Sequence, residues 1–110
     1  HPVAHSFPTR RSSDLLNDDL EIILHHHEFY NGNGYPDGIQ EKEIPLGSRI
    51  LNICDSFDVM TTGRSYKRAL SKEETIEEFE KCSGRQFDPE LAETMIELIK
   101  SGDLDDSFKN

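Results

Sequence analysis

The stretch LGSRILNICDSFDVMT, residues 46–61, decides the fold, because its apolar residues recur at the spacing of an α-helix. The residues that share one stripe of this helix are Leu46, Ile50, Ile53, Phe57 and Met60. A helix with one apolar stripe must bury that stripe against other elements of the domain. The stretch therefore predicts a core between packed helices.

A second helical pattern lies upstream of this stretch. From residue 16, apolar residues and one histidine share a helical stripe: Leu16, Leu20, Ile23, Leu24 and His27. We expect this helix to end near Phe29 or Tyr30, because the segment NGNGYPDG, residues 31–38, is dense in turn-forming glycine, asparagine and proline.

Two more helices are expected downstream. Ser71 and Glu74 have the spacing of a capping box and open a third helix, which Gly84 closes. Asp88 then caps a fourth helix that has proline at its first position and ends before Gly102. The residues expected to be buried on this helix are Leu91, Met95, Leu98 and Ile99. No segment alternates as a strand does, so the fold class is all-α.

Length and charge exclude several classes of protein. The chain has 110 residues, which suits one small domain, and its net charge is −10, with 22 acidic and 12 basic side chains. Such a charge disfavours binding to nucleic acid polymers and anionic membranes. No apolar run reaches the roughly 18 residues of a membrane span. Cys54 and Cys82 match neither a disulfide framework nor a short metal spacing, so we expect a reduced, cytoplasmic protein.

The first residues do not fit the rest of the chain. Residues 1–15 read HPVAHSFPTRRSSDL and show no helical or strand period. Residues 6–15 resemble the translation of a common sequencing adapter, so we interpret residues 1–15 as a non-native segment and residues 16–110 as the protein. Leaving out Arg10, Arg11 and Asp14 changes the net charge from −10 to −11.

Histidines and carboxylates gather where a metal site can form. If the upstream helix continues through residues 25–28, His26 and His27 lie on its buried side and His25 faces solvent. Asp55 stands among apolar residues of the second helix, and a carboxylate is rarely buried unless it is paired or bound to metal. Imidazole with carboxylate suits Fe, Mn, Zn or Ni. Hydrogen-bonded core histidines remain the alternative interpretation.

A basic cluster follows the second helix. Arg64, Lys67 and Arg68 are spaced i, i+3, i+4, and Arg49 lies upstream on the same helix. On so acidic a chain, a cationic patch beside a candidate metal site indicates a bound phosphate. Basic residues near a helix C-terminus also complement the helix dipole, so that interpretation stays open.

Taken together, these residues resemble a known family. The segment HHEFYNGNGYPDGIQEKEIPLGSRILNICDSFDVMTTGRSYKRALSKEET, followed by GRQFDPEL, resembles the HD-GYP family of cyclic di-GMP phosphodiesterases. The motifs HHE, GYP, IPL, DxFDxM, RxY and QFDP occur in the family's order. The resemblance implies an all-α bundle of the HD superfamily type, truncated at its N-terminal side. Residues 16–110 would be the C-terminal part of that domain.

The resemblance also implies a metal centre. His26 and His27 match the family's adjacent histidine ligands, and Asp55 matches its later aspartate ligand. The implied cofactors are two or three divalent metal ions, Fe or Mn first, with Zn or Ni as alternatives. The family's His-Asp dyad lies further upstream and is not found here. We therefore expect this chain to be a fragment that is inactive by itself.

Substrate and partners follow from the same resemblance. Tyr35 would pack on the substrate, while Arg64 and Lys67 would hold the phosphate or guanine of a cyclic dinucleotide. The implied reaction is metal-assisted hydrolysis of cyclic di-GMP in bacterial second-messenger signalling, controlled by a sensor or response-regulator domain. The alternative is a non-catalytic signalling module of the same fold, in which the loop at residues 34–36 contacts a protein partner.

Overall fold

The computed structural model describes the backbone of residues 12–108 and the side chains of residues 18–108. The elements in chain order are α1 (Ser12–Leu24), the 3₁₀ turn η2 (Glu41–Glu43), α2 (Leu46–Thr62), α3 (Lys72–Cys82), α4 (Pro89–Ser101) and the 3₁₀ turn η3 (Asp105–Phe108). Within the described ranges, β-structure is limited to two isolated bridges. The prediction of an all-α fold is therefore confirmed.

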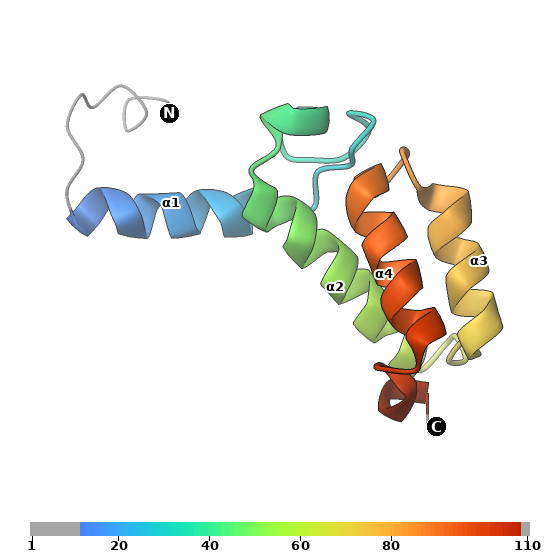
Figure 1. Cartoon of the computed structure of the whole chain (residues 1–110). Coiled ribbons are helices and arrows are strands. Elements are labelled where there is room, and N and C mark those ends of the chain that lie inside the picture. The colour runs from blue at the N-terminus through green and yellow to red at the C-terminus, as the bar shows by residue number, and fades with distance from the viewer. Residues whose placement is uncertain (1–11, 109–110) are drawn as a thin grey trace.

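Three of the helices form the packed body of the molecule. Helices α2, α3 and α4 lie against one another, while α1 extends away from them and contacts α2 (Figure 1). The segment between α1 and α2, which includes η2, lies at the end of the body where α2 begins (Figure 1). Residues 1–11, most of the segment that we interpret as a translated adapter, lie outside the described residues.

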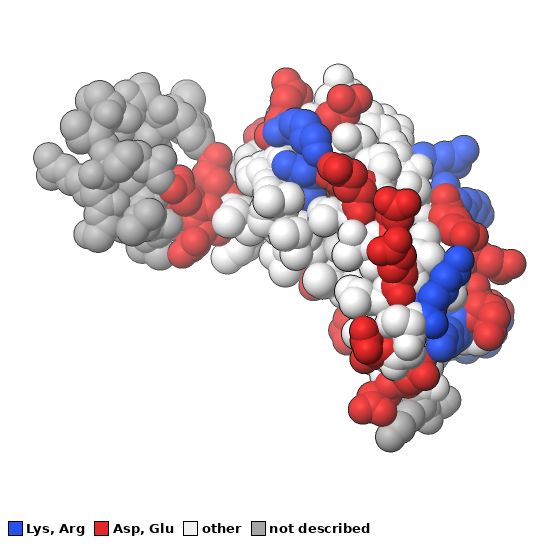
Figure 2. Space-filling view, in the orientation of Figure 1, with Lys and Arg blue, Asp and Glu red and all other residues white. Residues whose placement is uncertain are grey.

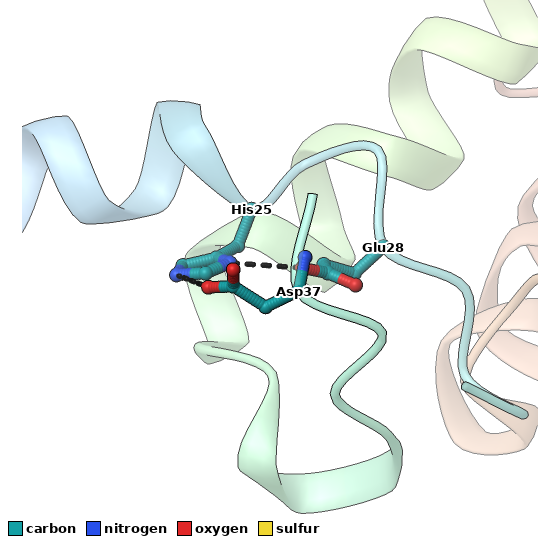
Figure 3. A group of neighbouring side chains, drawn as sticks. All are labelled: His25, Glu28 and Asp37. Atoms are coloured by element: carbon teal, nitrogen blue, oxygen red, sulfur yellow. Dashed lines mark hydrogen bonds and ion pairs between the residues drawn. The ribbon is translucent and has the colours of Figure 1, made fainter. Parts of the chain in front are cut away.

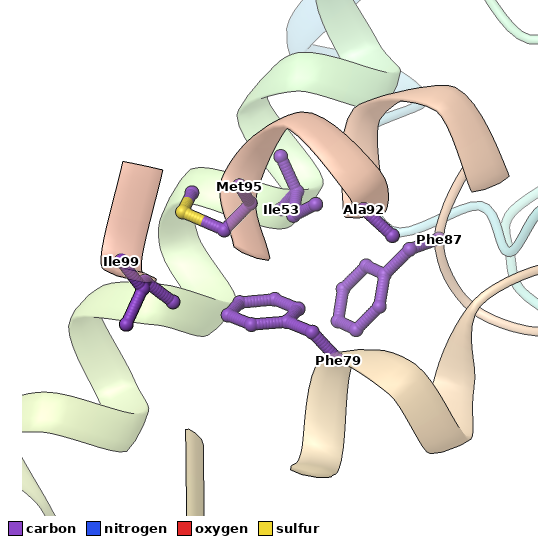
Figure 4. Close-up of a cluster of buried hydrophobic side chains, with 6 residues drawn as sticks. All are labelled: Ile53, Phe79, Phe87, Ala92, Met95 and Ile99. Atoms are coloured by element: carbon purple, nitrogen blue, oxygen red, sulfur yellow. The ribbon is translucent and has the colours of Figure 1, made fainter. Parts of the chain in front are cut away.

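The core lies between α2, α3 and α4 (Figure 4). Its buried members are Ile53, Phe79, Phe87, Ala92, Met95 and Ile99. The rings of Phe79 and Phe87 have centroids 5.1 Å apart. Phe79 and Ile99 expose none of their surface, so the third and fourth helices supply the best-buried positions of this core.

The ends of the last two helices agree with the sequence signals. Ser71 and Glu74 form the expected capping box at the start of α3. Asp88 caps α4 by accepting hydrogen bonds from the backbone N–H groups of Glu90 and Leu91, and Gly102 ends that helix in the left-handed conformation, with a φ of 90°. Both helices are fixed by short-range hydrogen bonds that their own sequences supply.

The end predicted for the first helix is wrong. Helix α1 ends at Leu24, and residues 25–27 form a turn in which the backbone N–H of Glu28 donates to the carbonyl of His25 at 3.0 Å. The helical stripe drawn from residue 16 therefore cannot be extended to residues 25–30. Beyond this turn, the Glu28 side chain accepts hydrogen bonds from the backbone N–H groups of Asp37 and Gly38, which a continued helix does not require.

Several stripe residues predicted to be buried are half exposed. They are Leu20 (54%), Ile23 (56%), Leu24 (50%), Leu46 (55%), Ile50 (43%) and Leu98 (40%). Most of them lie on α1 and on the first turns of α2, away from the core that α3 and α4 cover. Helical periodicity identifies an apolar face but does not show which element packs on it.

A buried ion pair fixes α4 against α2. Asp88 is 3% exposed, and Nη1 of Arg49 donates to its Oδ2 at 2.7 Å. Burial alone would raise the pKa of the Asp88 carboxyl, but the Arg49 guanidinium and the N–H groups at the start of α4 outweigh burial and lower it. Arg49 is thereby engaged in the structure and is not part of a phosphate site.

This lowered pKa makes the stability depend on pH. Asp88 contributes stability that is fully present above its ordinary pKa of 3.8 and is lost as pH falls through the lower folded value. We expect Asp88→Asn to lower the free energy of unfolding by about 1–3 kcal/mol at pH 7. Urea unfolding followed by circular dichroism at pH 7 and pH 3 measures both effects.

The difference in unfolding free energy between the wild type and Asp88→Asn separates the effect of Asp88 from that of the other carboxylates, which are present in both proteins. The gap in unfolding free energy should narrow between pH 7 and pH 3, because below pH 3.8 the unfolded chain takes up a proton at Asp88 more readily than the folded chain, in which Arg49 stabilises the carboxylate. A gap that stays constant over this range would contradict the assignment.

Candidate functional site

A buried carboxylate holds the glycine-rich loop in place. Glu28 is 2% exposed, and its two oxygens accept hydrogen bonds from the backbone N–H of Asp37 at 2.8 Å and of Gly38 at 2.9 Å. The same carboxylate lies 3.1 Å from Nδ1 of His25 (Figure 3). Glu28 therefore ties the end of the loop back to the turn that follows α1.

The environments of two neighbouring histidines reverse the sequence prediction. His25, expected to face solvent, is 6% exposed, and its Nε2 lies 3.8 Å from a carboxylate oxygen of Asp37 (Figure 3). His27, expected on the buried side, is exposed. Both predictions are wrong for one reason: α1 ends at Leu24, so helical spacing does not apply to these residues.

The cluster of His25, Glu28 and Asp37 also has the composition of a cation site. One possible ligand atom from each residue lies within 4.8 Å of the other two. Both oxygens of Glu28 already accept backbone hydrogen bonds, however, and Asp37 is exposed. The cluster is therefore best understood as the anchor of the loop.

Gly34 allows the loop to close. A Cβ at this position would lie 2.3 Å from the backbone nitrogen of Phe29 and 2.4 Å from the carbonyl oxygen of His27. No side chain fits there without displacing the backbone. The next residue, Tyr35, donates its backbone N–H to the same His27 carbonyl, and its ring stacks on the His27 ring with centroids 5.1 Å apart. The loop thus places an exposed aromatic ring beside the histidines.

His26 is oriented for ligation. Its Nδ1 is hydrogen-bonded to the carbonyl of Ile23, and a carbonyl can only accept, so Nδ1 carries the proton. In the neutral ring this leaves a lone pair on Nε2, which lies 3.7 Å from Oδ2 of Asp55. Metal-binding histidines characteristically donate their other ring N–H to a carbonyl in this way.

One cleft brings most of the predicted site residues together. It has a volume of about 710 Å³, and its lining includes five of the six: His26, His27, Asp55, Arg64 and Lys67. The sixth, Tyr35, lies outside that lining but stacks on His27. The side chain of Asp55, expected to be buried, is 58% exposed at the cleft. Of the apolar residues around Asp55, Ile53 is buried in the core, whereas Val59, one turn further along α2, lines the same cleft.

Fewer cations line the cleft than the sequence indicated, and they form what we call its basic side. Arg64 and Lys67 face each other across a two-way backbone bridge, with N···O distances of 2.8 and 3.0 Å. Arg68 instead pairs through both terminal nitrogens with Glu74, at 2.9 and 2.6 Å. The hydrogen bonds from Arg68 and from the backbone N–H of Ser71 lower the pKa of Glu74 to about 2. Arg64 and Lys67 are thus the two cations that line the cleft.

Two amide side chains in the cleft escaped the sequence analysis. Asn52, on α2, and Gln86, in the turn before α4, both line it. The motif GRQFDPEL contained Gln86, but nothing in its spacing indicated a place beside the histidines. Asn52 gave one usable signal, a polar residue next to the buried Ile53 and one turn before Asp55.

Comparison with known proteins agrees with this architecture. A family model described as "HD domain" matches residues 9–91. A cyclic di-GMP phosphodiesterase of Thermotoga maritima is 41% identical over 92 residues, which are 84% of this chain and 25% of that protein. A 3′3′-cGAMP-specific phosphodiesterase 2 of Vibrio cholerae is 42% identical over 88 residues, 80% of this chain and 17% of that protein.

A solved structure gives the same result. The crystal structure of a cyclic GMP-AMP-specific phosphodiesterase of V. cholerae aligns with a TM-score of 0.67 and 31% sequence identity, over 82% of this chain and 20% of the other. The chain therefore belongs to the HD domain family. These relatives are named cyclic di-GMP or cyclic GMP-AMP phosphodiesterases, which agrees with the resemblance to the HD-GYP phosphodiesterases.

The steric role of Gly34 can be tested against a glycine that has room for a side chain. We expect Gly34→Ala to destabilise the fold by about 1–3 kcal/mol and to abolish the contact between Tyr35 and His27, because the new methyl group displaces the loop backbone. The nuclear Overhauser effects between those two rings, with the urea midpoint, measure both changes.

The control is Gly84→Ala. A Cβ there meets nothing nearer than 3.9 Å, although the φ of +80° adds a cost of about 1 kcal/mol. This variant should keep the ring contacts of the wild type. Intact contacts in Gly34→Ala would contradict the close packing that we describe.

Proposed function

We propose that this chain is the C-terminal part of a metal-dependent phosphodiesterase domain that hydrolyses cyclic di-GMP in bacterial second-messenger signalling. The observation that carries the proposal is the cleft in which His26, His27 and Asp55 lie together with Arg64 and Lys67. Two relatives are named cyclic di-GMP phosphodiesterases, which supports a cyclic dinucleotide substrate. The chain spans 17–25% of the length of the relatives described above, so the activity is proposed for the longer protein.

The residues on one side of the cleft fit divalent metal ions. His26, with its free Nε2 facing Asp55, and the exposed His27 would hold them. Imidazole and carboxylate donors suit Fe or Mn, with Zn or Ni as alternatives, and the family resemblance favours two or three ions. When bound, such ions acidify water and neutralise charge on a phosphoryl group.

The other side of the cleft suits the nucleotide. Arg64 and Lys67 would bind phosphoryl oxygens, and their backbone bridge fixes the spacing of the two backbone positions that carry these side chains. Tyr35 is 61% exposed beside His27, so one face of its ring can stack on a purine. Binding phosphate near the histidines would orient the scissile bond toward the metal side.

The remaining features of the proposal concern the longer protein. We infer that the His-Asp dyad and further ligands lie upstream, so this chain would be inactive alone. A relative in Xanthomonas campestris is named a cyclic di-GMP phosphodiesterase response regulator, which supports control by a receiver or sensor domain. We infer a cytoplasmic location, and none of the described helices is long and apolar enough to cross a membrane.

Binding of Mn²⁺ tests whether His26, His27 and Asp55 hold metal ions. We expect His26→Ala, His27→Ala and Asp55→Asn each to weaken Mn²⁺ binding at least tenfold, measured by calorimetry at pH 7.5. Metal affinity of the unmodified chain should fall as the pH is lowered, because metal binding releases protons.

Asp37→Asn is the matched control, because Asp37 is an exposed carboxylate beside a histidine but outside the cleft. It should leave Mn²⁺ affinity within twofold of the wild type. Loss of binding in Asp37→Asn but not in Asp55→Asn would move the site to the loop anchor. No binding, either by this chain or by a longer one that carries the upstream ligands, would favour the non-catalytic signalling module.

Binding of cyclic di-GMP in saturating Mn²⁺ tests whether Arg64 and Lys67 bind the nucleotide. Arg64→Ala and Lys67→Ala should each weaken binding roughly tenfold, which corresponds to about 1.4 kcal/mol. Arg68→Ala should weaken it less than either of these, because its guanidinium is held by Glu74 and does not line the cleft, so its effect is limited to the loop. Equal effects from all three substitutions would show that only the net charge of the loop matters.

A further inference from the structure

The buried side chain of Asn52 links the turn that carries His26 to the helix that carries Asp55. Asn52 is 7% exposed and lies on α2, three residues before Asp55. Its Nδ2 donates to the backbone carbonyl of His26 at 2.8 Å and lies 3.5 Å from the carbonyl of Glu28. One side chain therefore holds the histidine turn against the helix that carries Asp55.

Gln86 fixes the orientation of that amide. Its Nε2 donates to Oδ1 of Asn52 at 3.4 Å and to Oγ of Ser56 at 3.2 Å. Because Oδ1 of Asn52 accepts from Gln86, the NH₂ group of Asn52 must face the two carbonyls, which can only accept. The backbone carbonyl of Gln86 also accepts from the N–H of Tyr30 at 3.1 Å, so the same residue holds the start of the loop.

The two ends of His26 are thus fixed by different partners. The ring is held by the Ile23 carbonyl through Nδ1, while the backbone carbonyl is held by Asn52. These contacts leave Nε2 as the free atom, 3.7 Å from Oδ2 of Asp55. A helix and a turn far apart in the sequence thereby present their ligand atoms at one place.

We propose that Asn52 is a positioning residue for the metal site, acting through His26, and that Gln86 holds Asn52 in the orientation this requires. Among the hydrogen bonds of the described residues, none joins Asn52 to a candidate ligand atom of Asp55, His26 or His27. Its effect is to set the separation of Nε2 and Oδ2. The consequence for metal affinity rests on the proposed function, whereas the orientation of His26 does not.

The test compares Asn52→Asp with the wild type. The aspartate has nearly the same size but no N–H groups, so the His26 carbonyl loses its donor and faces a carboxylate. In the metal-free chain, long-range ¹H–¹⁵N spectra of the histidine rings should change for His26 from one tautomer, protonated at Nδ1, to a mixture. Calorimetry should show Mn²⁺ binding weakened about 10–100-fold.

Ser56→Ala is the matched control. Ser56 lies one turn further along α2 and accepts from the same Gln86 amide, but among the described residues no hydrogen bond joins it to His26. It should leave both the His26 spectrum and the Mn²⁺ affinity within twofold of the wild type. Equal losses in Ser56→Ala and Asn52→Asp would overturn the proposal, because they would reflect a general loss of polar groups in the cleft.

Gln86→Ala is the second variant, and it is measured if Asn52→Asp fails to fold by circular dichroism. It keeps Asn52 but frees its amide to rotate, so the same two changes should appear, with affinity falling several-fold. An unchanged His26 spectrum in a folded Asn52→Asp or Gln86→Ala variant would overturn the proposal. Absence of Mn²⁺ binding, both by the wild type and by a longer chain that carries the upstream ligands, would instead contradict the proposed function, and the His26 spectrum would still decide the positioning role.

Discussion

The buried carboxylate of Glu28 is the constraint on which the site depends. It accepts hydrogen bonds from two consecutive backbone N–H groups of the loop and lies against the His25 ring. A buried carboxylate without such donors would be very costly, so the loop must return to this point whenever Glu28 is buried. The end of α1, the turn carrying the histidines and the position of Tyr35 all follow from that closure.

The sequence predicted the three helices of the packed body well, because their limits are set locally. The capping box at Ser71 and the cap at Asp88 with its following proline require only neighbouring residues. The end of α1 could not be predicted in this way. It depends on bonds between Glu28 and residues nine and ten positions later, and no helical period records that contact.

The site shows the same difference between local sequence signals, which could be predicted, and contacts between distant residues, which could not. Residue types and motif order identified His26, Asp55, Arg64 and Lys67, and the fold places all four at one cleft. The burial of Asp55 and the orientations of the neighbouring histidines were wrong, because both were inferred from helical spacing. The supporting amide of Asn52 was missed, since hydrogen bonds to distant carbonyls leave no pattern in a single sequence.

The pairing of Arg68 with Glu74 has a mechanical consequence. Oε1 of Glu74 accepts a hydrogen bond from the backbone N–H of Ser71, and both oxygens of that carboxylate accept from Arg68. One side chain therefore contacts both the first turn of α3 and the loop that precedes it. Fraying of that first turn would break both contacts, so the order of the Ser71 N–H and that of the Arg68 side chain are linked. The loop that carries Arg64 and Lys67 is thereby joined through Arg68 to a helix that contributes no cation to the cleft.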